Sequence, residues 1–431
     1  MELNPEHVQV ARSVTGGEDS RVRVVQGDFF SFDWPALLRG LPEPVLILGN
    51  PPWVTTATLG MLGSDNRPET RPRHDLTGLA AVTGRSNFDI SQAIMESCLE
   101  YLAARRGVLA MLCKQSVSRK VLEFAWNRGL PVTKAHAFGI DSARMFGAQV
   151  RACLLVVHMG IQGRAECQWF SDLDAPRASS TFGMADGRVV PDLVAYERTR
   201  HLARVPGHPG RETGPVRGPG RWRSGVKHDC ARVMELEQRD GHMWNQLGER
   251  VDIEDSHRFP LVKGSALHSG RLECDRRFVV VPQFHPGEDT LRLRIVAPRT
   301  WRYLEAQADY LDARASRIYR GKPRFSIFGI GPYSFSPWKV AVSGLHRDLI
   351  FRPVGPVGDK PVLFDDTCYF VPCPSREAAL ALASYLASAP VQDFFRARMF
   401  SDEKRPVTIR LLEQLDINRF LAPSESNDGS P

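Results

Sequence analysis

Several features that would mark a specialised class of protein are missing from this 431-residue sequence. No apolar run approaches the ~18–20 residues of a membrane-spanning helix, and the longest, such as residues 152–159, have the length of a strand. The first residues, Met-Glu-Leu-Asn-Pro, show no basic stretch followed by an apolar one, so no secretory signal is visible. Hydrophobic residues make up 42% and charged residues 24%, as in ordinary globular proteins. We therefore expect a cytoplasmic protein of about two to three domains without a membrane segment.

Signatures of metal sites and disulfides are lacking as well. The eight cysteines include no Cys-x-x-Cys pair, and Cys368 and Cys373 have no second pair with which to complete a zinc site. Most of the cysteines lie in apolar runs, where cysteine behaves as a small hydrophobic residue. The sequence therefore predicts neither a bound metal nor disulfide bonds.

Positive charge is concentrated in the second half of the chain. The formal net charge is +7, of which residues 201–431 carry about +6, and the block 291–340 alone carries about +7. In that block the basic residues interleave with aromatic ones, namely Trp301, Tyr303, Tyr319, Phe325, Tyr333 and Trp338. This pattern favours a polyanionic partner, although a basic surface over an aromatic core would produce it too.

The first part of the chain alternates strand-like and helix-like segments. Apolar periodicity predicts strands over 21–26, 45–48, 108–112, 132–137 and 152–157, and helices over 7–14, 90–103 and 117–127. Such alternation predicts an α/β domain, here residues 1–205, with a parallel sheet and helices on both faces.

A change of composition separates this domain from the rest. Residues 206–228 are rich in glycine, proline and arginine, and we interpret them as a linker or as a loop that is ordered only on a polyanion. Residues 229–421 mix short strands with a few helices, notably 376–388, which predicts a second domain of α+β type. Residues 422–431 have the composition of a frayed tail.

The segment most informative about chemistry is Asn50-Pro51-Pro52-Trp53, directly after the apolar run 45–48. In open α/β sheets ligands bind beyond the carboxyl ends of the strands, so this segment lies where a reactive site is expected. Two prolines fix the backbone and remove two donors, Asn50 adds an acceptor, and Trp53 adds a flat apolar face. Such a group can grip a planar ring while accepting hydrogen bonds from its exocyclic amine and stabilising the charge that develops on methylation. The plain alternative is a Pro-Pro turn that ends a strand.

With its Asn-Pro-Pro-Trp motif, the chain resembles DNA amino-methyltransferases that use S-adenosylmethionine, and the order of the other motifs is similar to that of the γ class. The resemblance implies a Rossmann-like catalytic domain in which Asn50, Pro51, Pro52 and Trp53 are catalytic. Segments 2–5, 28–30 and 86–89 resemble the family's cofactor-binding segments. The implied cofactor-binding residues are Glu2, Asp28, Phe29, Asn50, Pro52 and Asp89.

The resemblance also implies that the target base leaves the double helix. An exocyclic amine within a duplex is not accessible to in-line attack, so the base must be extruded into a pocket. Met145-Phe146-Gly147 resembles the segment whose aromatic ring stacks on the extruded base, so Phe146 and Trp53 are the expected stacking pair.

The second half resembles the target recognition domain of stand-alone modification methyltransferases, which reads the DNA sequence. Arginine and lysine side chains would follow the phosphates, and some arginines would contact guanine edges. The expected DNA-binding residues are Arg223, Arg317, Arg320, Lys322, Arg324, Lys339, Lys404 and Arg405.

The family's glycine-rich cofactor loop should lie some 20 or more residues before Glu2, so the resemblance predicts a chain that starts at the second strand and lacks the first. An upstream-encoded fragment is then an expected partner, besides double-stranded DNA and a cognate restriction endonuclease. The expected activity is methyl transfer to N6 of adenine. The alternatives are N4 of cytosine, an RNA or protein amine, and a catalytically incomplete DNA-binding remnant or split subunit.

Overall fold

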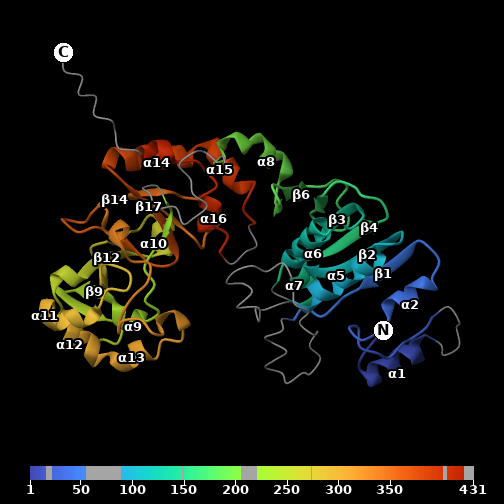
Figure 1. Cartoon of the computed structure of the whole chain (residues 1–431), viewed down its shortest axis with the longest axis horizontal. Coiled ribbons are helices and arrows are strands. Elements are labelled where there is room, and N and C mark those ends of the chain that lie inside the picture. The colour runs from blue at the N-terminus through green and yellow to red at the C-terminus, as the bar shows by residue number, and fades with distance from the viewer. Residues whose placement is uncertain are drawn as a thin grey trace, which may run out of the picture. The chain divides into compact units, whose positions relative to one another are not determined.

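The computed structural model describes residues 1–15, 22–54, 89–147, 150–204, 221–272, 274–400 and 405–421. Its contacts divide the chain into two compact units, Met1–Val194 and Ala195–Pro431 (Figure 1). The first unit thus ends before residue 205, where the sequence suggested that the first domain ends. Helix α8 (Leu193–Arg198) spans the boundary.

The first unit is built on a seven-stranded sheet with the order β1-β2-β4-β3-β5-β6-β7. Its strands are β1 (Val45–Gly49), β2 (Gly107–Lys114), β3 (Val132–Ile140), β4 (Ala152–Met159), β5 (Glu166–Phe170), β6 (Ser180–Ala185) and β7 (Arg188–Val190). Its helices are α1 (Pro5–Val14), α2 (Trp34–Arg39), α5 (Ile90–Leu102), α6 (Gln115–Asn127) and α7 (Ser142–Phe146). The predicted strands 45–48, 108–112, 132–137 and 152–157 and the three predicted helices are confirmed.

The prediction of a parallel sheet was wrong, because the sheet is mixed. β1 and β2 pair in parallel, but β4 lies between β2 and β3 and runs antiparallel to both. The connection from β3 to β4 contains only the five-residue helix α7. A parallel neighbour needs a crossover of roughly a dozen residues or more, so after this short connection the chain returns antiparallel.

The predicted strand over 21–26 is also not formed in the described residues. Of this segment only Gln26 pairs, through an isolated parallel bridge to Glu2. The backbone N–H of Glu2 donates to the Val25 carbonyl at 3.1 Å, and that of Gly27 donates to the Glu2 carbonyl at 3.1 Å. The segment 21–26 therefore has the alternating pattern of a strand, but only one of its described residues pairs with another segment, which is too few for a β-ladder.

Helices α5 and α6 cover one face of the sheet and bury its core (Figure 1). In α5 the apolar residues recur every three or four positions, which gives the helix one buried face. On β1 the pattern alternates: Val45 is buried, whereas Leu46 and Leu48 are 62% and 73% exposed. Over β1, therefore, the described helices cover one face and not the two that the alternation of elements predicted.

The second unit contains two sheets with mostly antiparallel pairs, a six-stranded one, β11-β10-β9-β13-β12-β16, and a four-stranded one, β15-β14-β17-β8. The strands are β8 (Arg223–Ser224), β9 (Glu235–Arg239), β10 (His242–Asn245), β11 (Arg250–Val251), β12 (Arg258–Val262), β13 (Arg277–Val280), β14 (Trp338–Ser343), β15 (Arg352–Val354), β16 (Leu363–Phe364) and β17 (Cys368–Cys373). The helices are α9 (Ala231–Met234), α10 (Gly264–Ser269), α11 (Leu293–Val296), α12 (Pro298–Ala306), α13 (Ala308–Asp312), α14 (Arg376–Ala387), α15 (Ala389–Arg396) and α16 (Ile409–Leu412). Helix α14 confirms the helix predicted over 376–388.

The last part of the predicted linker 206–228 is folded. Trp222 and Val226 are each 2% exposed, and β8 adds to the four-stranded sheet beside β17. The buried side chains of Trp222 and Val226 stabilise this segment, which its glycines and arginines could not do. Residues 205–220 and the predicted tail 422–431 lie outside the described residues.

We predict that Gly225→Ala destabilises the second unit by about 1–3 kcal/mol, because a methyl group would have to be accommodated in a packed site. A Cβ at this position would lie 2.0 Å from the Asp365 carbonyl oxygen and 2.4 Å from that of Phe364. Gly40→Ala is the control, since its nearest neighbour is at 3.5 Å. Calorimetric unfolding checks the prediction, and equal stabilities for the two variants would contradict it.

Candidate functional site

The Asn-Pro-Pro-Trp turn lies at the carboxyl ends of β1 and β2. The two strands pair in parallel with Leu48 opposite Ala110, so they end at the same edge of the sheet. In the turn Asn50 is exposed, while Pro51 is buried. The indole N–H of Trp53 donates to the Leu112 carbonyl at 3.3 Å, which fixes the ring against the end of β2.

The predicted aromatic pair does come together. The ring centroids of Trp53 and Phe146 are 6.2 Å apart, with their planes at 83°. The rings therefore meet edge to face and not with parallel faces. Phe146, at the end of α7, is 49% exposed.

A lysine that the sequence interpretation missed joins two segments of this site. Lys114, the last residue of β2, places its ammonium 3.0 Å from the Trp53 carbonyl oxygen and 2.7 Å from Oδ2 of Asp89. Asp89 caps α5, since its Oδ1 accepts from the Ser91 N–H at 3.1 Å. Lys114 precedes a helix in a chain rich in lysine and arginine, so nothing in the sequence distinguishes it.

Beside Asn50 the strand ends form an apolar hollow of about 350 Å³, a volume suited to a small ligand. Among its lining residues Asn50 is the one with a polar side chain; the lining consists of Leu48, Gly49, Asn50, Leu112, Ile140, Met145, Phe146, Leu154 and Leu173. Several of these follow the two-residue alternation of β1, β2 and β4, a signal that sequence analysis could have used.

The segments expected to bind the cofactor's adenosine end lie next to each other. The bridge between Glu2 and Gln26 brings Glu2 beside the segment that carries Asp28. A hydrogen bond from the Asn4 N–H at 2.8 Å lowers the pKa of Glu2 from its ordinary value. Phe29 packs on the core of the first unit, with its ring 5.1 Å from that of Trp34. Of the segment 86–89 only Asp89 lies within the described residues.

The basic residues of the second unit differ in their exposure and in whether an acidic side chain pairs with them. Residues 315–324, here called the basic loop, expose Arg317, Arg320 and Lys322, for which the described residues offer no ion-pair partner. The base of the loop is fixed by Arg314, whose guanidinium lies 3.7 Å from the Tyr319 ring centroid and donates to the Leu311 and Ser326 carbonyls.

Other predicted DNA-binding residues are already engaged. Arg324 pairs with Asp312 at 2.7 Å, which raises the pKa of the arginine, and Arg405 lies 3.5 Å from Asp366. The guanidinium of Arg223 lies over the Tyr333 ring at 4.5 Å. Lys404 lies outside the described residues.

The assignment of Lys339 to DNA binding was wrong, because this side chain is 1% exposed. Its ammonium donates to the carbonyls of Ser336 and Val362 at 2.5 and 2.9 Å. Burial lowers the pKa of Lys339 to about 7. A lysine within the apolar strand β14 therefore forms part of the core.

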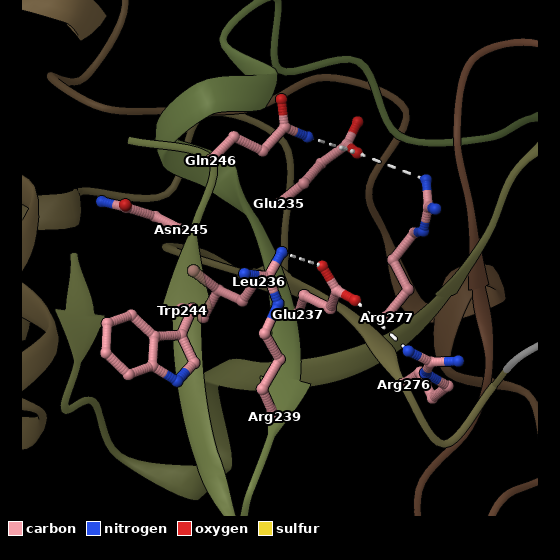
Figure 2. A pocket seen from close by; sticks show the side chains of 9 residues that line it. All are labelled: Glu235, Leu236, Glu237, Arg239, Trp244, Asn245, Gln246, Arg276 and Arg277. Atoms are coloured by element: carbon pink, nitrogen blue, oxygen red, sulfur yellow. Dashed lines mark hydrogen bonds and ion pairs between the residues drawn. The ribbon is translucent and has the colours of Figure 1, made fainter. Parts of the chain in front are cut away.

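A polar hollow of about 270 Å³ lies over β9, β10 and β13 (Figure 2). Its guanidinium groups face carboxylates: Glu237 lies 2.6 Å from Arg239 and 3.5 Å from Arg276. The hydrogen bond from Arg239 lowers the pKa of Glu237. The hollow is thus largely neutralised from within, in contrast to the basic loop.

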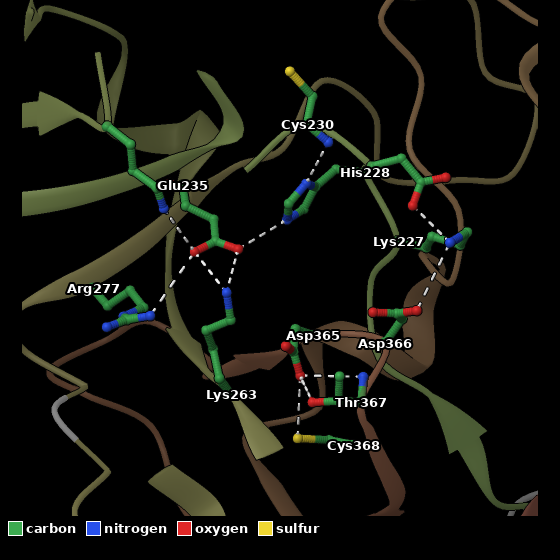
Figure 3. Close-up of polar contacts among 12 residues, drawn as sticks. Lys227, His228, Cys230, Glu235, Lys263, Arg277, Asp365, Asp366, Thr367 and Cys368 are labelled. Atoms are coloured by element: carbon green, nitrogen blue, oxygen red, sulfur yellow. Dashed lines mark hydrogen bonds and ion pairs between the residues drawn. The ribbon is translucent and has the colours of Figure 1, made fainter. Parts of the chain in front are cut away.

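One residue that lines this hollow, the buried carboxylate Glu235, joins several segments (Figure 3). Glu235 is 4% exposed and accepts from Lys263 at 2.7 and 3.0 Å, with His228 at 3.5 Å. Burial raises the pKa of Glu235, but the bonds from His228 and Lys263 outweigh it and leave the pKa below its ordinary value. This network holds β9 against the segment that follows β8, a structural task.

Metal sites and membrane-spanning helices are two features that the sequence disfavoured. Across the ranges that the structure describes, no group of three or more histidine, cysteine or acidic side chains has the arrangement of a metal site. In those same ranges no helix is long and apolar enough to cross a membrane.

Comparison with solved structures identifies a protein of similar fold. No model of a protein family matches the chain. A solved structure of the Type IIL restriction-modification enzyme MmeI in complex with DNA aligns with 90% of the chain at a TM-score of 0.55 and 12% identity. The chain spans about half, 48%, of that structure's length. The likeness shows that this chain shares its α/β fold with a restriction-modification enzyme.

The family follows from the sequence. The Type II methyltransferase M.NspV of Nostoc sp. (strain ATCC 29411 / PCC 7524) is 38% identical over 400 residues, which cover 93% of this chain and 81% of that protein. The chain belongs to the family of Type II methyltransferases.

Lys339→Met tests the burial of this lysine. The pKa of Lys339 is about 7 in the folded chain against 10.5 as the ordinary value, so between these pH values the unfolded state binds more protons. Wild-type stability therefore rises with pH over this range, by up to about 1.4 kcal/mol per pH unit from this group. Urea unfolding at pH 7, 8 and 9 should show a flatter dependence for Lys339→Met but not for the exposed Lys322→Met. Equal slopes for wild type and Lys339→Met would contradict the burial.

Proposed function

We propose that this protein transfers a methyl group from S-adenosylmethionine to N6 of adenine in duplex DNA, as the modification enzyme of a restriction-modification system. The observation that carries the proposal is the position of Asn50, which is exposed at the rim of an apolar hollow with Trp53 and Phe146 close by. Membership of the Type II methyltransferase family supports it.

The chemistry assigned to the turn is acceptance of hydrogen bonds. The Asn50 side-chain oxygen and the backbone carbonyls of the turn accept the two N–H groups of the target amine, which directs the nitrogen lone pair toward the methyl group. Because Pro51 and Pro52 fix the backbone, these acceptors do not reorganise as positive charge develops on the nitrogen. No strong base is required at this stage.

The residues present fit the cofactor that this reaction needs. Glu2 and Asp28 bring acceptor oxygens, the Glu2–Gln26 bridge holds Glu2 against the segment that carries Asp28, and Phe29 follows Asp28 with an apolar ring. We assign these residues to the adenosine portion, and assign Asn50, Pro52 and Asp89 to the end nearer the reaction. When bound, S-adenosylmethionine supplies an electrophilic methyl group.

The proposed reaction requires the target base to be extruded from the duplex. The target amine must leave the duplex to reach Asn50, and stacking on an aromatic ring is worth about 1–3 kcal/mol per base. Trp53 is fixed to the end of β2, whereas Phe146 is half exposed. We assign Trp53 as the fixed wall of the base pocket and Phe146 as the wall that turns onto the base.

DNA binding is assigned to the second unit, chiefly to the basic loop. Its free cations, Arg317, Arg320 and Lys322, are the ones available to phosphates. The engaged residues Arg223, Arg324 and Arg405 would first have to exchange a protein partner for DNA.

Digestion of DNA from cells that express the chain, followed by separation of the nucleosides, tests the proposal directly. N6-methyl-2′-deoxyadenosine is expected. N4-methyl-2′-deoxycytidine would keep the mechanism but change the target base, since cytosine presents a similar amine. Absence of both would favour a DNA-binding protein without catalysis.

Asn50→Ala should reduce methyl transfer below a few per cent of wild type, because the acceptor for the target amine is lost. DNA affinity should stay within about twofold, since affinity resides mainly in phosphate contacts. Asn127→Ala, an exposed asparagine at the end of α6, is the matched control. Tritium transfer and gel-shift assays measure the two quantities, and retained methylation by Asn50→Ala would rule out the catalytic assignment.

Replacing Arg317, Arg320 and Lys322 together by glutamine should weaken DNA binding and flatten its salt dependence. If each cation contacts one phosphate, the slope of log K against log salt falls by up to about 2.7, at ~0.9 per contact. The Arg239→Gln/Arg276→Gln variant should change the slope less, because these cations already face Glu237. An unchanged slope in the triple variant would mean that the basic loop does not face DNA.

A further inference from the structure

We propose that Lys114 is a positioning residue, which fixes the Asn-Pro-Pro-Trp turn in the form that can hold the target amine. The inference rests on the proposed function, because it concerns the same site. Lys114 contacts neither the Asn50 side chain nor the Trp53 ring; it bonds the Trp53 carbonyl and Asp89, and it acts on the reaction through them.

The geometry ties three separate segments through one ammonium group. Lys114 ends β2, and its Nζ donates to the Trp53 carbonyl at 3.0 Å and to Asp89 Oδ2 at 2.7 Å. The Trp53 indole donates back to β2, at the Leu112 carbonyl. Trp53 is therefore held to β2 at its backbone and at its ring, so its orientation is defined at both ends.

Burial makes the charge of Lys114 necessary. The side chains of Lys114 and Asp89 are 24% and 11% exposed. A carboxylate so poorly hydrated is costly unless a cation or several donors compensate it. Ser91 donates to Asp89 Oδ1 through its N–H and its hydroxyl, so removing the ammonium would leave Oδ2 without its cation and the Trp53 carbonyl without its donor. Both segments would be expected to move toward water.

The two oxygens of Asp89 have different partners, so the link to Lys114 can be tested apart from the cap of α5. Its Oδ1 caps α5 through Ser91, while its Oδ2 faces Lys114. Asp89→Asn keeps an oxygen for the cap but replaces the charge that holds the ammonium. This variant therefore disturbs the same link as Lys114→Met from the other side, without removing the cap.

The first measurement uses the free protein and does not depend on activity. In protein labelled with 5-fluorotryptophan, the Trp53 signal is assigned from Trp53→Phe. It should shift and broaden in Lys114→Met and in Asp89→Asn, and recover in Lys114→Arg, which restores a donor. It should stay unchanged in Lys120→Met, the matched control, since this exposed lysine lies on α6 away from the turn.

The second measurement is the single-turnover rate of methyl transfer. A displaced turn should lower the rate constant in Lys114→Met on the order of 10- to 100-fold, the scale expected for a misplacement near 1 Å. The dissociation constant for DNA should change by less than about twofold. A purely structural role would instead lower the active fraction and leave the rate constant of the remaining enzyme unchanged.

The outcomes separate this inference from the proposed function. An unshifted Trp53 signal, or a wild-type rate constant in Lys114→Met, would overturn the positioning role of Lys114. A wild-type chain that binds DNA but methylates neither base would overturn the proposed function, and the fluorine spectra would still decide whether Lys114 fixes Trp53. If Lys114→Met fails to fold, Asp89→Asn supplies the fluorine measurement, and Lys114→Gln supplies the rate constant because Asp89 is itself assigned to the cofactor.

Discussion

The parallel pairing of β1 with β2 is the constraint on which the candidate site depends. It brings the ends of both strands to one edge of the sheet, with Gly49 opposite Met111. From there the chain enters the Asn-Pro-Pro-Trp turn on one strand and reaches Lys114 on the other. The two bonds that hold Trp53, at the Leu112 carbonyl and at the Lys114 ammonium, both run to β2. A shift of this pair by one residue would send the side chains to opposite faces and separate the turn from its supports.

Sequence reasoning recovered the elements that carry strong local patterns. The continuous apolar run of β1 and the helical periodicity of α5 and α6 each specify one type of element, and the structure contains them. The direction of β4 was not recoverable in the same way, because a strand's own residues do not encode the direction of its neighbours. That direction follows from the short α7 connection. The segment 21–26 has a strand pattern as well, but a ladder needs a partner backbone, and Glu2 supplies a single bridge.

In the candidate site, too, some residues could be predicted from sequence motifs and others could not. Asn50 and Trp53 were singled out because an Asn-Pro-Pro-aromatic order is rare, and Phe146 because its segment resembles one of the family's. The link between Lys114, Trp53 and Asp89 exists only in space. Charge counting was the weaker guide, since it treats every cation as equal. Lys339 contributes to the surplus of the block 291–340, yet it is buried among backbone carbonyls. Its place between Trp338 and Val340 in an apolar run was the signal that it belongs to the core.

The supports of the site are unequal, and this inequality suggests how the pocket would receive a base. Pro51 and Pro52 fix the acceptor backbone, and two hydrogen bonds to β2 hold Trp53. Among the described residues Phe146 has no comparable support: it ends a five-residue helix that Asp141 caps at one end and the left-handed Gly147 ends at the other, and half of its side chain is exposed. Phe146 meets Trp53 edge to face, so under the proposed function the change to parallel faces would fall to Phe146. The fixed Trp53 ring would then set where the amine lies, and the Phe146 ring would follow the base.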